Sequence, residues 1–135
     1  MPGPLPRRST LKMERVMEEE GFKGLKVWQR SKDLAVSIYR ISLEGALSRD
    51  YGLKDQLRRA AVSIASNLAE GDERDTDKDA VRFFFFAKGS VAELRTQLQI
   101  AFEIGYIEEK IFKKMDNECS QIGRMIGALI KTRRN

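Results

Sequence analysis

The sequence predicts an all-α protein, an antiparallel up-down-up-down four-helix bundle. Apolar residues recur at helical spacings through most of the chain, and glycine and short polar stretches divide it into four long segments. No segment shows the sustained alternation of a β-strand. Because short connections between long amphipathic helices make neighbours antiparallel, we expect residues 24–135 to form one bundle domain.

Residues 1–23 are expected to form a leader outside the bundle. The first ten residues, MPGPLPRRST, hold all three prolines and predict disorder. The charged stretch LKMERVMEEEG, residues 11–21, is typical of a short helix that ends at its glycine. We assign this leader no function.

The first two bundle helices are predicted over residues 27–45 and 50–72. Each carries one apolar stripe of the kind that a half-buried helix presents to a core. The first stripe is Val27, Ser31, Leu34, Ala35, Ile38, Ile41 and Gly45, and the second is Leu53, Leu57, Ala60, Ala61, Ile64 and Leu68.

A polar ladder runs beside the second stripe. Ser63, Asn67 and Glu70 lie three or four residues apart, on neighbouring turns of one helix face. Polar groups beside a core need partners, so the ladder bonds either to another helix or to something outside the bundle. We favour the internal role, in a structural network of Arg59, Ser63, Asn67, Glu70, Ser90 and Glu93.

The third helix is predicted to begin at Thr76, which forms a capping box with Asp79, and to continue to about Ile104. Gly105 then stops it, and a fourth helix is expected over residues 108–132. Its inward positions are Ile111, Phe112, Met115, Cys119, Ile122, Ile126 and Leu129.

The second and third helices are expected to fold back on each other around residues 72–76. This arrangement places Arg59 opposite Ser90 and Asn67 opposite Arg82. We therefore hypothesise an ion pair between Glu93 and either Arg58 or Arg59.

Four consecutive phenylalanines, residues 83–86, lie on the predicted third helix. At about 100° per residue they sweep about 300° of its surface, and one core stripe accommodates two of them. We expect Phe83 and Phe84 to enter the core. Phe85 and Phe86 then face either a neighbouring helix of the same chain or, as we favour, an oligomer interface.

Many residues of the chain, in order from 24 to 130, resemble the four-helix-bundle family of 23S rRNA intervening-sequence proteins. The resemblance is densest in the second helix. The matching positions are Val27-Trp28-Gln29, Asp33-Leu34, Tyr39, Gly52-Leu53, Gln56-Leu57-Arg58-Arg59-Ala60, Ser63-Ile64, Asn67-Leu68-Ala69-Glu70-Gly71, Arg74, Arg82-Phe83, Ala87-Lys88-Gly89-Ser90, Glu93-Leu94 and Gly105-Tyr106-Ile107. Ala65 departs from the family pattern, which usually has proline after Ser-Ile, and Ala46-Leu47 stands where a Phe-Pro pair is common.

This resemblance implies a homo-oligomer, with a ring-shaped homopentamer favoured, and an association with rRNA. The family is also similar to the accessory variability determinant of diversity-generating retroelements. That similarity implies a reverse transcriptase and its RNA as partners.

The chain is moderately basic, and its positive charge is unevenly distributed. Its formal net charge is +5 with a pI near 9.5, and residues 119–135 contain no acidic side chain. Basic residues there either complement the helix C-terminus or contact phosphates. The first candidates for phosphate contact are Arg124, Lys131, Arg133 and Arg134, followed by Arg58, Arg74, Lys78 and Arg82, each of which has internal ion pairing as its alternative.

The residues that most enzymes use are missing. The chain has no histidine and no glycine-rich phosphate loop, and its single cysteine, Cys119, lies at an apolar helix position. The acidic run of residues 72–79 lacks the glycine and terminal glutamate of a calcium loop. We therefore expect no enzyme activity, metal or cofactor.

The same sequence features indicate a cytoplasmic protein. A lone cysteine suits a reducing compartment, and no apolar run is long enough to span a membrane. The leading hypothesis is a non-enzymatic oligomer that binds RNA or other nucleic acid through basic surfaces. The alternative is a protein–protein scaffold or adaptor ring with no direct role in nucleic-acid binding.

Overall fold

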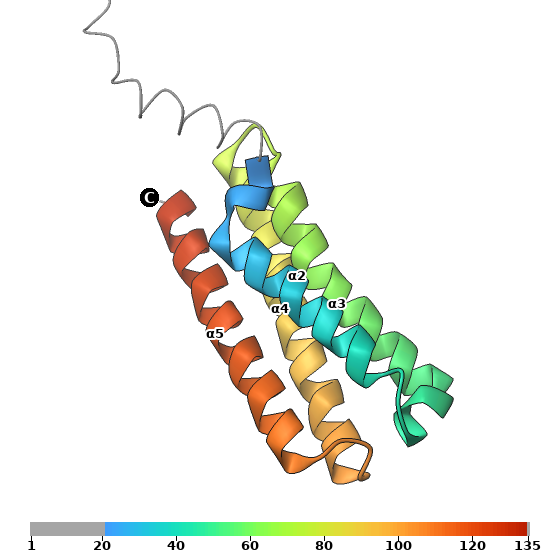
Figure 1. The fold of residues 1–135 in the computed structure, drawn as a ribbon. Coiled ribbons are helices and arrows are strands. Elements are labelled where there is room, and N and C mark those ends of the chain that lie inside the picture. Colours follow the sequence, from blue (N-terminus) through green and yellow to red (C-terminus); the bar gives the residue numbers. More distant parts are fainter. Residues whose placement is uncertain (1–20, 135) are drawn as a thin grey trace, which may run out of the picture.

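The structure, a computed structural model, describes residues 21–134 and forms the predicted all-α bundle (Figure 1). The expected leader helix over residues 11–21 falls almost wholly outside the described residues. In chain order the elements are the 3₁₀ turn η1 (Gly21–Gly24), α2 (Lys26–Ile41), the 3₁₀ turn η2 (Ala46–Arg49), α3 (Tyr51–Asp72), α4 (Asp77–Glu103) and α5 (Glu109–Arg134).

Polar side chains cap the two central helices, close to the boundaries predicted from the sequence. Asp50 accepts a hydrogen bond from the Leu53 amide at 3.1 Å and so begins α3. Thr76 accepts one from the Asp79 amide at 3.2 Å and begins α4. These caps satisfy amide groups that have no partner within the helix.

The first bundle helix is shorter than predicted. It ends at Ile41, and Gly45 is an exposed residue in a left-handed turn with φ of 60° rather than an inward position. The hydroxyl of Ser42 donates to the Tyr39 carbonyl at 2.9 Å, which offers that carbonyl a partner outside the helix ladder. Leu47 of η2 fills the end of the core in place of Gly45 and is fully buried.

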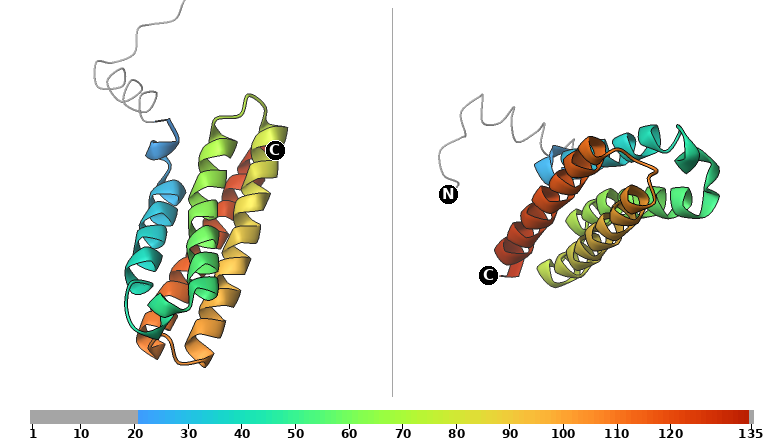
Figure 2. Two further views of the ribbon diagram at one scale, coloured as in Figure 1. Left: turned by 90° about the vertical axis from the view of Figure 1, so that its right-hand side faces the viewer. Right: turned by 90° about the horizontal axis from the view of Figure 1, so that it is seen from below.

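Successive helices run antiparallel, and the two ends of the bundle gather different elements (Figures 1 and 2). The α3–α4 end holds the turn between these helices, η1 and the C-terminal end of α5. The α4–α5 end holds η2 and the turn after α4. There the Tyr106 hydroxyl donates to the Asp50 carboxylate at 3.0 Å, which ties the two turns together.

The core follows the predicted stripes with few exceptions. Cys119 is fully buried among aliphatic side chains, as expected of a core-filling residue. On α5 the stripe ends at buried Ile130, whereas Leu129, which we expected to point inward, is half-buried. Ile41, Leu53, Ile111 and Phe112 are likewise half-buried at the margin of the core.

Gly71 of α3 lies close against the Phe84 ring of α4. Both residues are buried, and Phe84 has no exposed surface. A Cβ atom at Gly71 would lie 2.6 Å from Cε1 of the Phe84 ring and 3.1 Å from the Ala80 carbonyl oxygen. Gly71 therefore provides the space that the aromatic ring occupies.

The pairing of α3 and α4 differs from the predicted register. Ser63, rather than Arg59, meets Ser90, with 2.8 Å between the two hydroxyl oxygens. Side chains point toward the N-terminus of their own helix, so in an antiparallel pair the residues that touch are displaced from those at equal height. The prediction considered only the position of each residue along the helix axis and left out this displacement.

The predicted ion pair between Glu93 and Arg58 or Arg59 is wrong. Neither arginine forms a salt bridge with Glu93 within the described part of the chain. Arg59 and Glu93 are both exposed, and Arg58 turns toward α2 instead. The register is not the cause, since the observed pairing of Ser63 with Ser90 brings Glu93 level with Ala60, beside Arg59. The pair is absent because both side chains face solvent.

We expect Gly71→Ala to lower the free energy of unfolding by about 1–2 kcal/mol, because the new methyl group overpacks against the Phe84 ring. Gly89→Ala is the matched control. A Cβ there meets nothing within 4 Å, so the better helix propensity of alanine stabilises the protein by up to about 1 kcal/mol. Urea unfolding measures both changes. Equal stability of the two variants would show that the ring has room to move.

Candidate nucleic-acid interface

The last two arginines of α5 lie next to each other in sequence but in different surroundings. The guanidinium group of Arg133 is half-buried and pairs with Asp72 at 3.1 Å and Asp77 at 3.6 Å. It also lies 5.7 Å from the centre of the Phe84 ring. Arg133 thus holds the end of α5 to the α3–α4 turn. Arg134 is exposed.

Arg134 belongs to a group of exposed basic residues on α4 and α5. With Lys88 and Lys131 it lines a shallow depression of about 590 Å³ that also contains Phe85. Arg124 lies two turns before Lys131 on the same side of α5. We call these four residues, Lys88, Arg124, Lys131 and Arg134, the α4–α5 basic surface.

The charges of this surface are not neutralised within the described part of the chain. None of its four members takes part in a salt bridge there. The Arg134 guanidinium lies 5.6 Å from the centre of the Phe85 ring, which supports the side chain from one side. Lys88 is not among the phosphate contacts predicted from the sequence; the structure places it beside Lys131 and Arg134 of α5.

The basic residues around the α3–α4 turn have nearby acids instead. Arg74 lies 3.9 Å from Glu70, and Arg82 lies 3.9 Å from Asp79. Both guanidinium groups also lie over the Phe83 ring, at 4.3 and 5.0 Å. This mixture of charges attracts a polyanion less than an unpaired cluster does.

Lys78 is exposed in the first turn of α4, close in sequence to Asp77 and Asp79. It takes part in no salt bridge among the described residues. The acidic neighbours nevertheless offset its charge, so we rank it below the α4–α5 basic surface as a phosphate contact.

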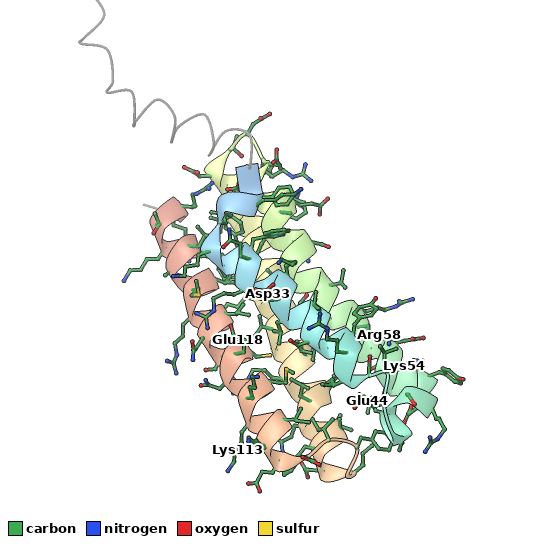
Figure 3. The ribbon with its side chains drawn as sticks, viewed as in Figure 1. Asp33, Glu44, Lys54, Arg58, Lys113 and Glu118 are labelled. Atoms are coloured by element: carbon green, nitrogen blue, oxygen red, sulfur yellow. The ribbon has the colours of Figure 1, made fainter. Side chains whose placement is uncertain are left out.

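Arg58 fills a structural position between α2 and α3 (Figure 3). Its Nε donates to the Ser42 hydroxyl at 2.8 Å, and its guanidinium lies 4.4 Å from the centre of the Tyr39 ring. The side chain is half-buried. Arg58 therefore ties the end of α2 to α3.

The polar ladder bonds mostly within the bundle. Asn67 donates to the Ser63 carbonyl at 2.9 Å and to the Ser63 hydroxyl at 3.0 Å. Ser63 in turn meets Ser90, whose hydroxyl lies 3.2 Å from the Phe86 carbonyl. Glu70 at the end of the ladder is exposed. Of these contacts, the one between Ser63 and Ser90 joins α3 to α4, and the others lie within a single helix.

The four phenylalanines divide between inside and outside. Only Phe84 enters the core, where it is fully buried, whereas Phe83, which we also expected there, is half-buried outside the core cluster. Phe85 and Phe86 are 45% and 50% exposed. Phe83 and Phe86 contact each other edge to face, with ring centres 5.8 Å apart. Two large aromatic rings are thus left on the surface of α4.

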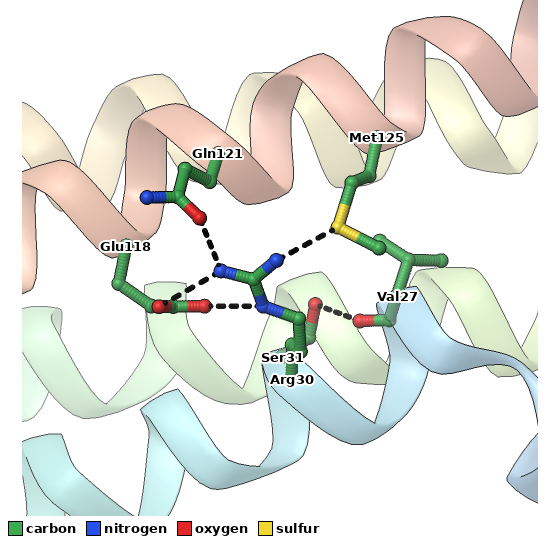
Figure 4. A network of polar contacts seen from close by, with 6 residues as sticks. All are labelled: Val27, Arg30, Ser31, Glu118, Gln121 and Met125. Carbon is green, nitrogen blue, oxygen red and sulfur yellow. Dashed lines mark hydrogen bonds and ion pairs between the residues drawn. The ribbon is translucent and has the colours of Figure 1, made fainter.

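A further basic residue, Arg30, forms a clamp between α2 and α5 that the sequence did not reveal (Figure 4). Its guanidinium donates to both oxygens of Glu118, at 2.8 and 3.0 Å, and to the side-chain oxygen of Gln121 at 2.6 Å. The hydrogen bond with Glu118 raises the pKa of Arg30 above its usual value. Arg30 is therefore a structural cation.

The single thiol of the chain, Cys119, has low reactivity. Burial raises the pKa of Cys119 to about 12, so the group stays a neutral thiol at physiological pH and is a poor nucleophile. Residues 21–134 contain no group of three or more acidic or cysteine side chains placed to hold a metal ion. No helix in that range is long and apolar enough to cross a bilayer.

The profile of the 23S rRNA-intervening sequence protein family matches residues 23–128, which is most of the chain. This chain belongs to that family. The match includes Lys88 and Arg124 of the α4–α5 basic surface and ends before Lys131 and Arg134. Neither the family nor the fold indicates an enzyme.

A solved crystal structure has a similar fold. It is a protein of unknown function from the S23 ribosomal protein family of Bacteroides thetaiotaomicron, determined at 1.70 Å. The TM-score is 0.72 at 20% sequence identity, and the match covers 78% of this chain and 98% of the other. Among curated proteins, none matches this sequence.

We expect Arg133→Ala to reduce the free energy of unfolding by about 1–2 kcal/mol, because it leaves the largely buried Asp72 carboxylate without its partner. Arg134→Ala removes the same charge from an exposed position and should change stability by less than about 0.5 kcal/mol. Thermal and urea unfolding compare the two variants. Equal losses would mean that the pairing of Arg133 with Asp72 contributes no net stability.

Proposed function

We propose that this protein is a non-enzymatic, oligomeric RNA-binding bundle that contacts phosphates through its α4–α5 basic surface. The observation that carries the proposal is the clustering of Lys88, Arg124, Lys131 and Arg134 without salt-bridge partners in the described part of the chain. RNA is preferred among polyanions because the chain belongs to the 23S rRNA-intervening sequence protein family.

The chemistry of this surface determines the kind of binding. Lysine and arginine side chains on an open surface contact phosphate oxygens and release counterions, which gives binding that tolerates sequence and falls steeply with salt. The depression is shallow, and its aromatic ring, Phe85, already lies beside Arg134. We therefore assign Phe85 no role in stacking on bases.

Assembly would strengthen this binding. Phe85 and Phe86 expose large apolar area on α4, and such clusters are typical of protein–protein interfaces. We propose that they form the contact between copies, in a homopentamer. Because Phe85 borders the α4–α5 basic surface, neighbouring subunits would bring their basic surfaces close together and enhance attraction for a polyanion.

The oligomer is tested with Phe85→Glu/Phe86→Glu, which places two charges on the proposed interface. We expect the wild-type chain to sediment as an oligomer at micromolar concentration and the variant as a folded monomer, because the interface must desolvate both carboxylates. Ile104→Glu is the control, since Ile104 is a similarly exposed apolar residue at the other end of α4. A monomeric wild-type chain contradicts the proposal.

RNA binding is tested by titrating labelled structured RNA at several salt concentrations with the variant Arg124→Gln/Lys131→Gln/Arg134→Gln. Each phosphate interaction that the variant removes should make the negative slope of log affinity against log salt shallower by about 0.7–0.9, and affinity at low salt should fall as well. Stability should stay close to that of the wild-type chain, because the three side chains form no salt bridges with described residues. The oligomeric state is measured in parallel, because Arg134 contacts Phe85 of the proposed interface.

The charge-matched control is Lys110→Gln/Lys113→Gln/Lys114→Gln, at the opposite end of α5. It removes the same net charge, so a comparison of the two variants distinguishes the effect of the α4–α5 basic surface from the effect of the overall charge of the protein. Equal losses in both triple variants would contradict a defined site. No binding by the wild-type chain even at low salt would favour the alternative, a scaffold whose partner is a protein.

A further inference from the structure

An apolar groove runs along the outside of α2 and α3, away from the residues assigned to RNA binding and assembly. Its volume is about 600 Å³. Its walls include large apolar side chains that remain partly exposed, among them Leu43 at 69%, Tyr39 at 43% and Val62 at 41%. The small residues Ala65 and Ala69 of α3 form part of its floor and leave room for an occupant.

The groove has basic residues along its α2 side. Lys32 and Arg40 both line it and are exposed, and Lys32 also contacts the Asp33 carboxylate at 2.7 Å. Arg58 adds a third positive charge at the Tyr39 ring. An occupant with an apolar face and acidic flanks would match both the walls and the rim.

The chain itself enters the described structure at one end of this groove. Phe22 of η1 lines the groove and packs edge to face against Trp28, with ring centres 5.2 Å apart. Gly21 has φ of 53°, a left-handed conformation that suits a sharp change of direction. The residues before Gly21 therefore start beside the groove.

The sequence of residues 11–20, which lie outside the described residues, has the required chemistry. Met13, Val16 and Met17 are spaced as one face of a helix, while Leu11 falls on the opposite face. The segment contains four glutamates against Lys12 and Arg15, so it is acidic overall. As a helix its ten residues would span about 15 Å, which is shorter than the length of α2, about 24 Å.

We propose that residues 11–20 dock into the α2–α3 groove of their own chain as a short amphipathic helix. Met13, Val16 and Met17 cover the exposed surfaces of Tyr39 and Val62, and the glutamates lie near Lys32 and Arg40. Docking within one chain needs only a short connection, so its effective concentration is in the millimolar range and a small apolar contact suffices. In this proposal residues 11–20 add a short fifth helix to the bundle.

Trp28 gives a direct test, because it is the only tryptophan of the chain and lines the groove. In full-length protein, Val16→Asp/Met17→Asp should shift its emission to longer wavelength and increase quenching by acrylamide, since the apolar face no longer docks. Leu11→Asp is the matched control and should leave both signals unchanged. Identical spectra of the wild-type chain and the double variant would overturn the proposal.

Hydrogen exchange adds a second readout from the groove side. Amides of residues 11–20 should be protected in the wild-type chain and lose protection in Val62→Asp, which places a charge in the groove. Because the Val62 side chain is already 41% exposed, this substitution should leave the bundle folded. The Trp28 signal should not depend on protein concentration. A signal that develops only as concentration rises would identify a second copy as the occupant and overturn intramolecular docking.

Discussion

The packing of the Phe84 ring against Gly71 is the constraint on which the rest of this bundle depends. It brings α3 and α4 closer together than a side chain at residue 71 would permit. Once Phe84 is inside, the helical period turns Phe85 and Phe86 outward. The guanidinium of Arg133 on α5 also lies beside the Phe84 ring, so this ring contacts both α3 and α5 at the α3–α4 end.

Within a single turn of α5, one arginine is neutralised by acidic residues of the bundle, and its neighbour keeps a charge at the surface that no described residue neutralises. Arg133 neutralises Asp72 and Asp77 of the α3–α4 turn, while Arg134 lies over Phe85 at the surface. Farther along, Arg30 holds α5 to α2 through Glu118. Two classes of basic residue thus stand out, cations that close the bundle and cations that make up the α4–α5 basic surface. Only the second class supports the proposal of RNA binding.

Much of the local structure could be predicted because it depends on residues near each other in the chain. Asp50 and Thr76 cap helices through amides three residues away, and the apolar stripes follow from helical periodicity alone. The prediction was wrong where two distant segments meet. The contacts between α3 and α4 depend on the directions in which side chains leave each helix, so Ser63 meets Ser90 while Arg59 and Glu93 both face solvent.

By itself, the sequence determined the all-α class, the helix boundaries to within a few residues, the family and the concentration of basic residues near the C-terminus. Only the tertiary structure decided which of those basic residues are neutralised. Arg133 and Arg134 are adjacent residues with the same side chain, so a prediction from sequence pattern does not distinguish them. Their difference arises from acids more than fifty positions earlier, which the fold brings to one arginine and not to the other.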